Sequence, residues 1–107
     1  MTELDDSVTA SVKGTLDPSG GLRLFLTGEL DIVSVDGVKE VISELFASNP
    51  RRVVFDLERL TFMDSSGIAL MLQLSRRVDS VEVVNATPIV RRVIEATGLD
   101  QILGLQS

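Results

Sequence analysis

The spacing of hydrophobic and polar residues changes several times along this chain, and each change predicts a new element. Residues 8–16 alternate imperfectly, and residues 22–27 place a leucine at every second position, which is the period of a β-strand. Residues 17–21 lie between them and favour a turn, because their proline fixes φ and their glycines permit positive φ. The two strands are therefore predicted to form an antiparallel hairpin.

The spacing then becomes helical. Residues 28–31 leave the second strand, and Ser34 is a candidate N-cap for the helix that follows. A single apolar stripe runs along that helix and consists of Val38, Val41, Ile42 and Leu45. Such a stripe is typical of an amphipathic helix that packs on a core, and this helix is expected to end near Pro50.

Two more strands follow the first helix. Residues 51–57 are short, β-branched and apolar enough to predict a strand covered on both faces. Residues 80–85 predict another buried strand. A helix precedes each of them and returns the chain by a crossover, so these strands are expected to be parallel.

Two more helices alternate with these strands. Residues 64–67 open the second helix, which is expected to run to about Val78. Thr87-Pro88 predicts an N-cap followed by proline at the first helical position, and Gly98 predicts the end of the third helix. The apolar tail at residues 99–105 is expected to pack on the sheet or on a helix.

The order β-β-α-β-α-β-α predicts an α/β domain with a small mixed sheet. We interpret residues 1–107 as a single domain, because the length is typical of one domain and no repeat or linker divides the chain. Residues 1–7 are polar and acidic, and we expect them to be flexible.

Composition excludes several classes of function. The chain has neither cysteine nor histidine, so disulfides, thiolate metal sites, a cysteine nucleophile and the usual general base are excluded. We therefore expect no enzyme activity, no cofactor and no metal site. The net charge of −6 argues against nonspecific binding to nucleic acid. No apolar run reaches the roughly 18 residues of a membrane span, so we expect a cytoplasmic protein without membrane insertion.

The candidate chemistry lies at the start of the second helix, where Asp64, Ser65, Ser66 and Gly67 form a polar corner. In the simplest interpretation, Asp64 or Ser65 caps the helix and satisfies backbone N–H groups of its first turn. Gly67 would then let that turn approach the neighbouring chain closely.

Three other interpretations give this corner a chemical role. A nucleophilic serine needs a base, but the chain has only two lysines, Lys13 and Lys39, and both are predicted on other elements. A phosphate-binding loop is disfavoured, because the P-loop spacing is absent and Asp64 repels anions. A serine that is itself phosphorylated fits better, since a helix N-terminus favours the new negative charge and the fold would survive.

The second helix carries more apolar residues than one core-facing stripe needs. That stripe consists of Ile68, Met71, Leu72 and Val78. Ala69, Leu70 and Leu74 lie off it, and a helix that is apolar on more than one side is either deeply buried or docked to a partner. We expect an exposed apolar patch beside Ser65; the alternative is that Leu70 and Leu74 pack on the C-terminal tail.

Three segments resemble the bacterial STAS domain, and specifically the stand-alone anti-sigma factor antagonists, or anti-anti-sigma factors. They are Gly-Glu-Leu-Asp at 28–31, Phe-Met-Asp-Ser-Ser-Gly-Ile at 62–68 and Arg-Arg-Val-Ile-Glu-Ala-Thr-Gly-Leu-Asp at 91–100. Their order and separations are those of the family, and the likeness spans nearly the whole chain. The resemblance implies a mixed sheet of four to five strands flanked by helices.

The resemblance also implies partner switching in transcription regulation. The unphosphorylated antagonist binds an anti-sigma factor, a serine protein kinase of the GHKL type, and so releases a sigma factor. The kinase ends the interaction by phosphorylating the antagonist with ATP, and a PP2C-type phosphatase restores it. The family phosphoacceptor directly follows the aspartate and corresponds to Ser65.

The residues implied to bind the partner surround this serine. Glu29 and Asp31 match an acidic loop near the family's interface, and Ala69 replaces a glycine that many antagonists have. Two other functions stay open, namely a scaffold subunit of a transporter or stress-signalling complex without a phosphorylation cycle, and a nucleotide- or ligand-sensing STAS domain. The expected partner-binding set is Glu29, Asp31, Asp64, Ser65, Ser66, Gly67, Ile68 and Leu70.

Overall fold

The order of the helices and strands agrees with the sequence. The computed structural model describes residues 9–106, so residues 1–7, which we expected to be flexible, lie outside the described part. The elements are β1 (Ala10–Leu16), β2 (Gly21–Leu30), α1 (Val35–Leu45), the 3-10 helix η2 (Phe46–Ser48), β3 (Arg52–Met63), α2 (Ser65–Ser75), β4 (Ser80–Val84) and α3 (Pro88–Ala96). The predicted order β-β-α-β-α-β-α is confirmed. None of the described helices is long and apolar enough to cross a membrane.

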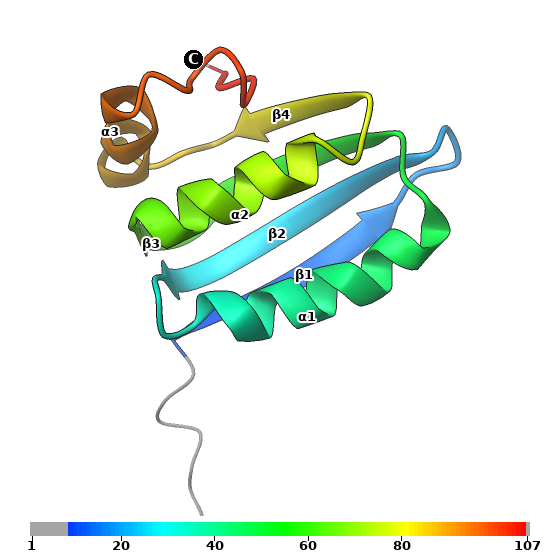
Figure 1. The fold of residues 1–107 in the computed structure, drawn as a ribbon, viewed down its shortest axis with the longest axis horizontal. Helices are drawn as coiled ribbons and strands as arrows, with labels where there is room; N and C mark the ends of the chain where they lie inside the picture. The colour runs from blue at the N-terminus through cyan, green and yellow to red at the C-terminus, as the bar shows by residue number, and fades with distance from the viewer. Residues whose placement is uncertain (1–8, 107) are drawn as a thin grey trace, which may run out of the picture.

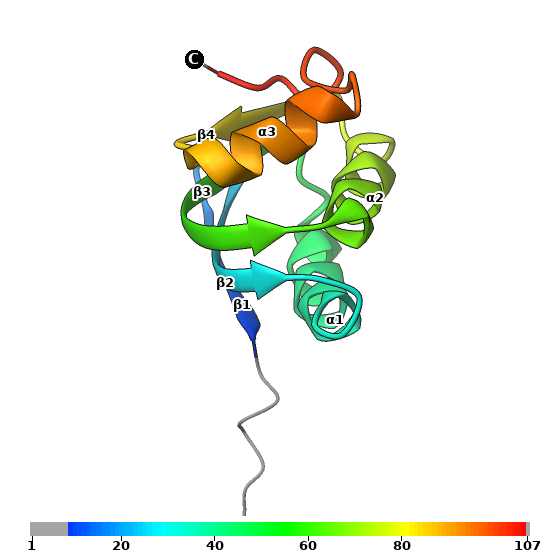
Figure 2. The same cartoon turned by 90° about the vertical axis from the view of Figure 1, so that its left-hand side faces the viewer.

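The four strands form one mixed sheet in the order β1-β2-β3-β4. β1 and β2 pair antiparallel, as predicted for the hairpin, whereas the pairs β2–β3 and β3–β4 are parallel. Helices α1 and α2 lie side by side on one face of the sheet, and α3 lies near the end toward which β4 runs (Figure 1, Figure 2). The loops that follow β2 and β3 therefore meet at one end of the sheet.

The alternation of side chains along β2 and β3 builds the core. The buried apolar residues on these strands, each at most 2% exposed, are Leu22, Leu24, Leu26 and Leu30 of β2 and Val53, Phe55, Leu57, Leu60 and Met63 of β3. Between them, Val54 and Asp56 point to the opposite face, which α1 and α2 leave uncovered in the described part of the chain (Figure 2). The prediction that residues 51–57 are covered on both faces is therefore wrong in part: helices cover one face, and neighbouring strand side chains partly cover the other.

Both central strands are longer than predicted. β2 continues to Leu30 and β3 to Met63, with register shifts in their pairing between Phe25 and Thr27 and between Gly28 and Glu29. Gly28 has φ +90°, and a Cβ there would lie 2.0 Å from the carbonyl oxygen of Thr9, so glycine is required at this bend. The irregular pairing extends the strands toward the start of α2.

The C-terminal tail packs on the sheet, which is one of the two placements we expected. Leu103 is completely buried, and Leu105 forms a parallel bridge with Val83 of β4. The tail therefore pairs with the outer edge of β4. α2 ends at Ser75, earlier than the predicted Val78.

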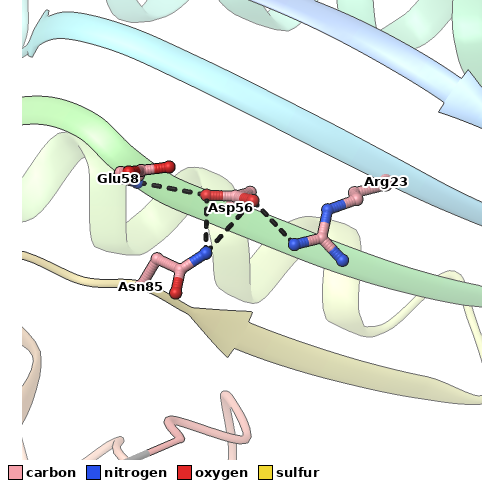
Figure 3. A network of polar contacts seen from close by, with 4 residues as sticks. All are labelled: Arg23, Asp56, Glu58 and Asn85. Carbon is pink, nitrogen blue, oxygen red and sulfur yellow. Dashed lines mark hydrogen bonds and ion pairs between the residues drawn. The ribbon is translucent and has the colours of Figure 1, made fainter.

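A polar network joins β2, β3 and the residue after β4 (Figure 3). The carboxylate of Asp56 is nearly buried and accepts hydrogen bonds from the Arg23 guanidinium at 2.7 Å and from the Asn85 side-chain amide at 3.3 Å. The backbone N–H of Glu58 donates another at 3.2 Å. Burial by itself raises the pKa of Asp56, but these bonds to the ionised carboxylate outweigh it and hold the pKa below its usual range.

We predict that Asp56→Asn lowers the free energy of unfolding near neutral pH by about 1–3 kcal/mol, because the network loses its charged acceptor. The folded-state pKa of Asp56 is depressed, so its contribution is present above the unfolded pKa of about 3.9 and is lost as pH falls through the folded value. Urea unfolding at several pH values should therefore show the two proteins converging below about pH 4.

The matched control is Glu82→Gln on the exposed side of β4, which should change the unfolding free energy by less than about 0.5 kcal/mol at any pH. A difference between wild type and Asp56→Asn that stays constant down to about pH 2 would contradict the assigned role of the carboxylate.

Candidate functional site

Asp64 is the residue at which β3 ends and α2 begins. Its backbone is extended, and its side chain accepts a hydrogen bond from the N–H of Ser66 at 2.9 Å. Its carbonyl accepts another from the N–H of Gly67 at 3.1 Å. Asp64 is thus the N-cap of α2, and it satisfies a backbone donor that the first turn leaves without a helical partner.

The two serines of this corner have different surroundings. The Ser66 hydroxyl donates a short hydrogen bond to the capping oxygen of Asp64. This bond is the main reason why the pKa of Asp64 lies below its usual range, and the backbone amides of Ser66, Ile32 and Gly67 act in the same direction. Ser65 is exposed, and its hydroxyl makes no hydrogen bond to any residue that the structure describes. Only Ser65 therefore presents an unengaged hydroxyl to a second protein.

The loop between β2 and α1 lies against this corner. The N–H of Asp64 donates a hydrogen bond to the carbonyl of Leu30, the last residue of β2, at 3.1 Å. In the strand pairing just before the corner, Glu29 lies opposite Phe62, and Leu30 lies opposite Met63. The ends of both strands and the start of α2 are thereby held together.

Asp31 and Ser34 shape that loop. The carboxylate of Asp31 accepts hydrogen bonds from the backbone N–H groups of Val33 and Ser34 at 3.1 and 3.0 Å. Ser34 occupies the predicted N-cap position of α1, but its hydroxyl bonds to the carbonyl of Glu29 at 2.9 Å and does not cap the helix. The acidic side chain of Asp31 thus has a structural role as well as a place near Ser65.

The structure separates the expected partner-binding residues into two groups. Glu29 and Ser65 are exposed, and three further residues, Asp31, Asp64 and Ser66, are half-buried beside them. The other group consists of Gly67, Ile68 and Leu70, which are buried. Those three residues can support a surface from beneath, but they do not form it.

The expected exposed apolar patch on α2 is wrong. Leu70 is 3% and Leu74 is 4% exposed, so both belong to the core. The reason is that α1 packs beside α2: Leu70 lines a shallow hollow between the two helices together with Val35 and Lys39 of α1. α2 is therefore buried against the sheet on one side and against α1 on another.

An apolar surface that we did not predict from the sequence lies beside the corner. Ile32 and Val33 are each 72% exposed, and Phe62 is 41% exposed. The amide of Ile32 contacts the Asp64 carboxylate, which places the loop residues next to the cap. The sequence does contain a sign of this surface: the two apolar residues between Asp31 and Ser34 do not belong to the apolar stripe of the helix that follows.

Fold and site together define a STAS domain. The STAS domain family model matches residues 10–107, and the chain belongs to this family. The anti-sigma-F factor antagonist RsfB of Mycobacterium tuberculosis is 33% identical over 105 residues, which cover 95% of this chain and 84% of RsfB.

Solved structures agree with this assignment. An anti-sigma factor antagonist from Mycobacterium paratuberculosis superposes with a TM-score of 0.80 at 26% identity, covering 97% of this chain and 89% of that one. The anti-sigma factor antagonist SpoIIAA in its unphosphorylated form gives 0.75 at 28% identity, covering 90% and 88%. The phosphorylated form of SpoIIAA, a Bacillus cell fate determinant, gives 0.66 at 27% identity, covering 90% and 91%.

We predict that Gly67→Ala destabilises the corner. A Cβ at Gly67 would lie 2.5 Å from Cγ of Met63 and 3.0 Å from Cδ2 of Leu30, so the side chains beneath α2 would have to move. We expect a loss of about 1–3 kcal/mol in the free energy of unfolding, measured by urea denaturation.

Gly37→Ala in α1 is the matched control, because a Cβ there meets nothing within 4 Å. It should stabilise the protein by about 0.5–1 kcal/mol through helix propensity. If Gly67→Ala stabilised the protein to the same extent, the close packing assigned to this turn would be incorrect.

Proposed function

We propose that this protein is an anti-sigma factor antagonist whose unphosphorylated form binds an anti-sigma factor and which is released when Ser65 is phosphorylated. The observation that carries the proposal is the difference between the two serines: Ser66 is bonded to Asp64, whereas Ser65 is exposed and unengaged among the described residues. The names of the relatives and the two phosphorylation states of SpoIIAA support the proposed function.

The partner in this proposal is a serine protein kinase of the GHKL type. It transfers the γ-phosphoryl group of ATP to Oγ of Ser65; the hydroxyl proton leaves, a P–O bond to Ser65 forms, and ADP departs. A PP2C-type phosphatase would return the serine by hydrolysing that bond to release inorganic phosphate. The antagonist supplies an acceptor and a docking surface, and the partners supply the catalysis.

A phosphate at Ser65 is compatible with the fold. Ser65 is the first residue of α2, where unpaired backbone N–H groups and the helix dipole favour a negative charge. Ser65 is also exposed, so the phosphate displaces no core side chain. The modification would therefore act on the surface and leave the packing of α2 unchanged.

The same phosphate would change the surface strongly. It adds about −1.5 to −2 charges next to Asp64 and near Asp31 and Glu29, in a chain whose net charge is already −6. The adjacent apolar residues Ile32 and Val33 would contact the partner in the unphosphorylated state. Charge repulsion and the desolvation of a phosphate beside an apolar contact both oppose binding.

We predict that incubation with the cognate kinase and ATP adds about 80 Da to the wild-type protein and to Ser66→Ala, but adds nothing to Ser65→Ala. Intact-protein mass spectrometry checks this, and circular dichroism establishes that each variant is folded. Phosphate on Ser66 in the wild-type protein would contradict the assignment. A scaffold without a phosphorylation cycle would instead accept no phosphate at either serine.

We predict that Ile32→Asp weakens binding to the anti-sigma factor at least about tenfold, or 1.4 kcal/mol, because it removes an apolar contact and adds a charge. Ile102→Asp is the control, since Ile102 is 62% exposed but lies in the C-terminal tail. Titration calorimetry should give wild-type affinity for that control. Equal affinities of the two variants would exclude the β2–α1 loop from the interface.

A further inference from the structure

The two edges of the sheet differ. At the β4 edge, the N–H of Val83 donates to the carbonyl of Gly104 at 2.9 Å, and the N–H of Gln106 donates to the carbonyl of Val83 at 2.9 Å. The C-terminal tail thus pairs with that edge. At the other edge, β1 pairs with β2 alone among the described strands.

The hydrogen bonds at the two ends of the hairpin fix which backbone groups of β1 face outward. The N–H of Glu29 donates to the carbonyl of Thr9, and the N–H of Asp17 donates to the carbonyl of Gly21. In an antiparallel ladder, alternate residues point their backbone groups at the partner strand, so the odd-numbered residues of β1 face β2. The backbone N–H and C=O groups of Ala10, Val12, Gly14 and Leu16 therefore point away from the sheet.

A groove of about 400 Å³ runs along this edge, between β1 and α1. Four consecutive residues, 9–12, line it on the β1 side, although their side chains alternate between the two faces of the sheet. The groove must therefore follow the backbone edge itself. On the helix side, Gly37, Val38 and Val41 line it together with Val33 and Ser34 of the preceding loop. Gly37 leaves room beside the strand because it has no side chain.

The outer rim of the groove is acidic. Glu40 and Glu44 are exposed and follow the lining residues Gly37 and Val41 by three positions, so each lies beside one of them on the helix surface. Lys39, the one lysine of α1, lines the hollow on the other side of the helix, toward α2. The groove, whose lining combines valines with the hydroxyl residues Thr9, Ser11 and Ser34, is thus bordered by negative charge on its helix side.

We propose that the β1 edge and this groove bind an extended segment of another protein, in which apolar and arginine or lysine side chains occupy alternate positions on the helix-facing side. Its backbone would extend the sheet by pairing with the outward groups of Ala10 and Val12. Its apolar side chains would contact Val41, and its basic ones would lay their stems in the groove and reach Glu40 and Glu44. Ser65 does not line the groove, although Val33 of the β2–α1 loop does, and we expect the segment to bind whether or not Ser65 is phosphorylated.

A second copy of this chain fits the edge poorly. Two β1 strands paired antiparallel would place both α1 helices on the same face, each with Glu40 and Glu44 turned toward the seam. Each copy also carries a net charge of −6. Like charges at close range oppose such a dimer, whereas a basic strand is attracted.

The test is a titration of the ¹⁵N-labelled protein with the peptide Thr-Val-Thr-Arg-Thr-Val-Thr-Arg, which places valine and arginine on one face. We expect saturable shifts of the amide signals of Ala10, Val12, Gly37 and Val41. Hydrogen exchange at Ala10 and Val12 should slow at least about tenfold at saturation, because their free N–H groups become bonded. A peptide with glutamate in place of arginine should bind at least about tenfold more weakly.

Variants localise the effect. Glu40→Lys with Glu44→Lys should weaken the arginine peptide at least about tenfold, whereas Glu58→Lys with Glu82→Lys, the same charge change at exposed positions on β3 and β4, should stay within about threefold. Ser65→Asp should bind the peptide as the wild type does, which separates this result from the proposed phosphorylation switch.

Three outcomes would overturn the proposal. The first is no shift at Ala10 and Val12 at millimolar peptide, and the second is a shift confined to another surface. The third is a concentration-dependent dimer, seen by sedimentation equilibrium, that protects the β1 amides without peptide.

Discussion

The hydrogen bonds that the Asp64 carboxylate accepts from the amide and the hydroxyl of Ser66 determine how the rest of the corner is organised. They begin α2, and they hold the second serine so that, of the two, only Ser65 has a hydroxyl without a hydrogen bond to a described residue. The N–H of Asp64 bonds in turn to the carbonyl of Leu30, so the cap also fixes the end of β2. Through its carboxylate and its backbone N–H, Asp64 thus connects the start of a helix, the end of a strand and the chemical difference between two adjacent serines.

The same connection explains why a surface modification would act as a switch without unfolding the protein. α2 is buried against the sheet and α1, so Gly67 and Leu70 on its inward side lie away from a group added at the exposed Ser65. The neighbouring loop presents Ile32 and Val33 to solvent, where a partner can contact them. Because α2 is packed on its inward side and the apolar residues Ile32 and Val33 lie at the surface, a single phosphate can alter binding at small cost in stability.

The sequence predicted those features that depend on local pattern. Element order, the hairpin and the alternation along β2 follow from side-chain periodicity and turn residues. Residues 58–62 were missed as a strand because they are largely polar and are held by irregular pairing with β2, which is a tertiary property. Leu70 was placed on the surface because helical periodicity reports one buried stripe, whereas its burial depends on a second helix distant in sequence. The choice between Ser65 and Ser66 rested on family resemblance until the geometry of Asp64 gave it a physical reason.

In the function that we propose, the charge state of Ser65 controls the affinity for the anti-sigma factor while the fold stays the same. The most direct measurement is calorimetric titration of the partner with unphosphorylated protein and with protein phosphorylated at Ser65, together with urea unfolding of both. We predict at least about a hundredfold loss of affinity, or 2.7 kcal/mol, on phosphorylation, and unfolding free energies of the two forms that agree within about 0.5 kcal/mol. Equal affinities of the two forms, or a loss of affinity matched by loss of the fold, would contradict it.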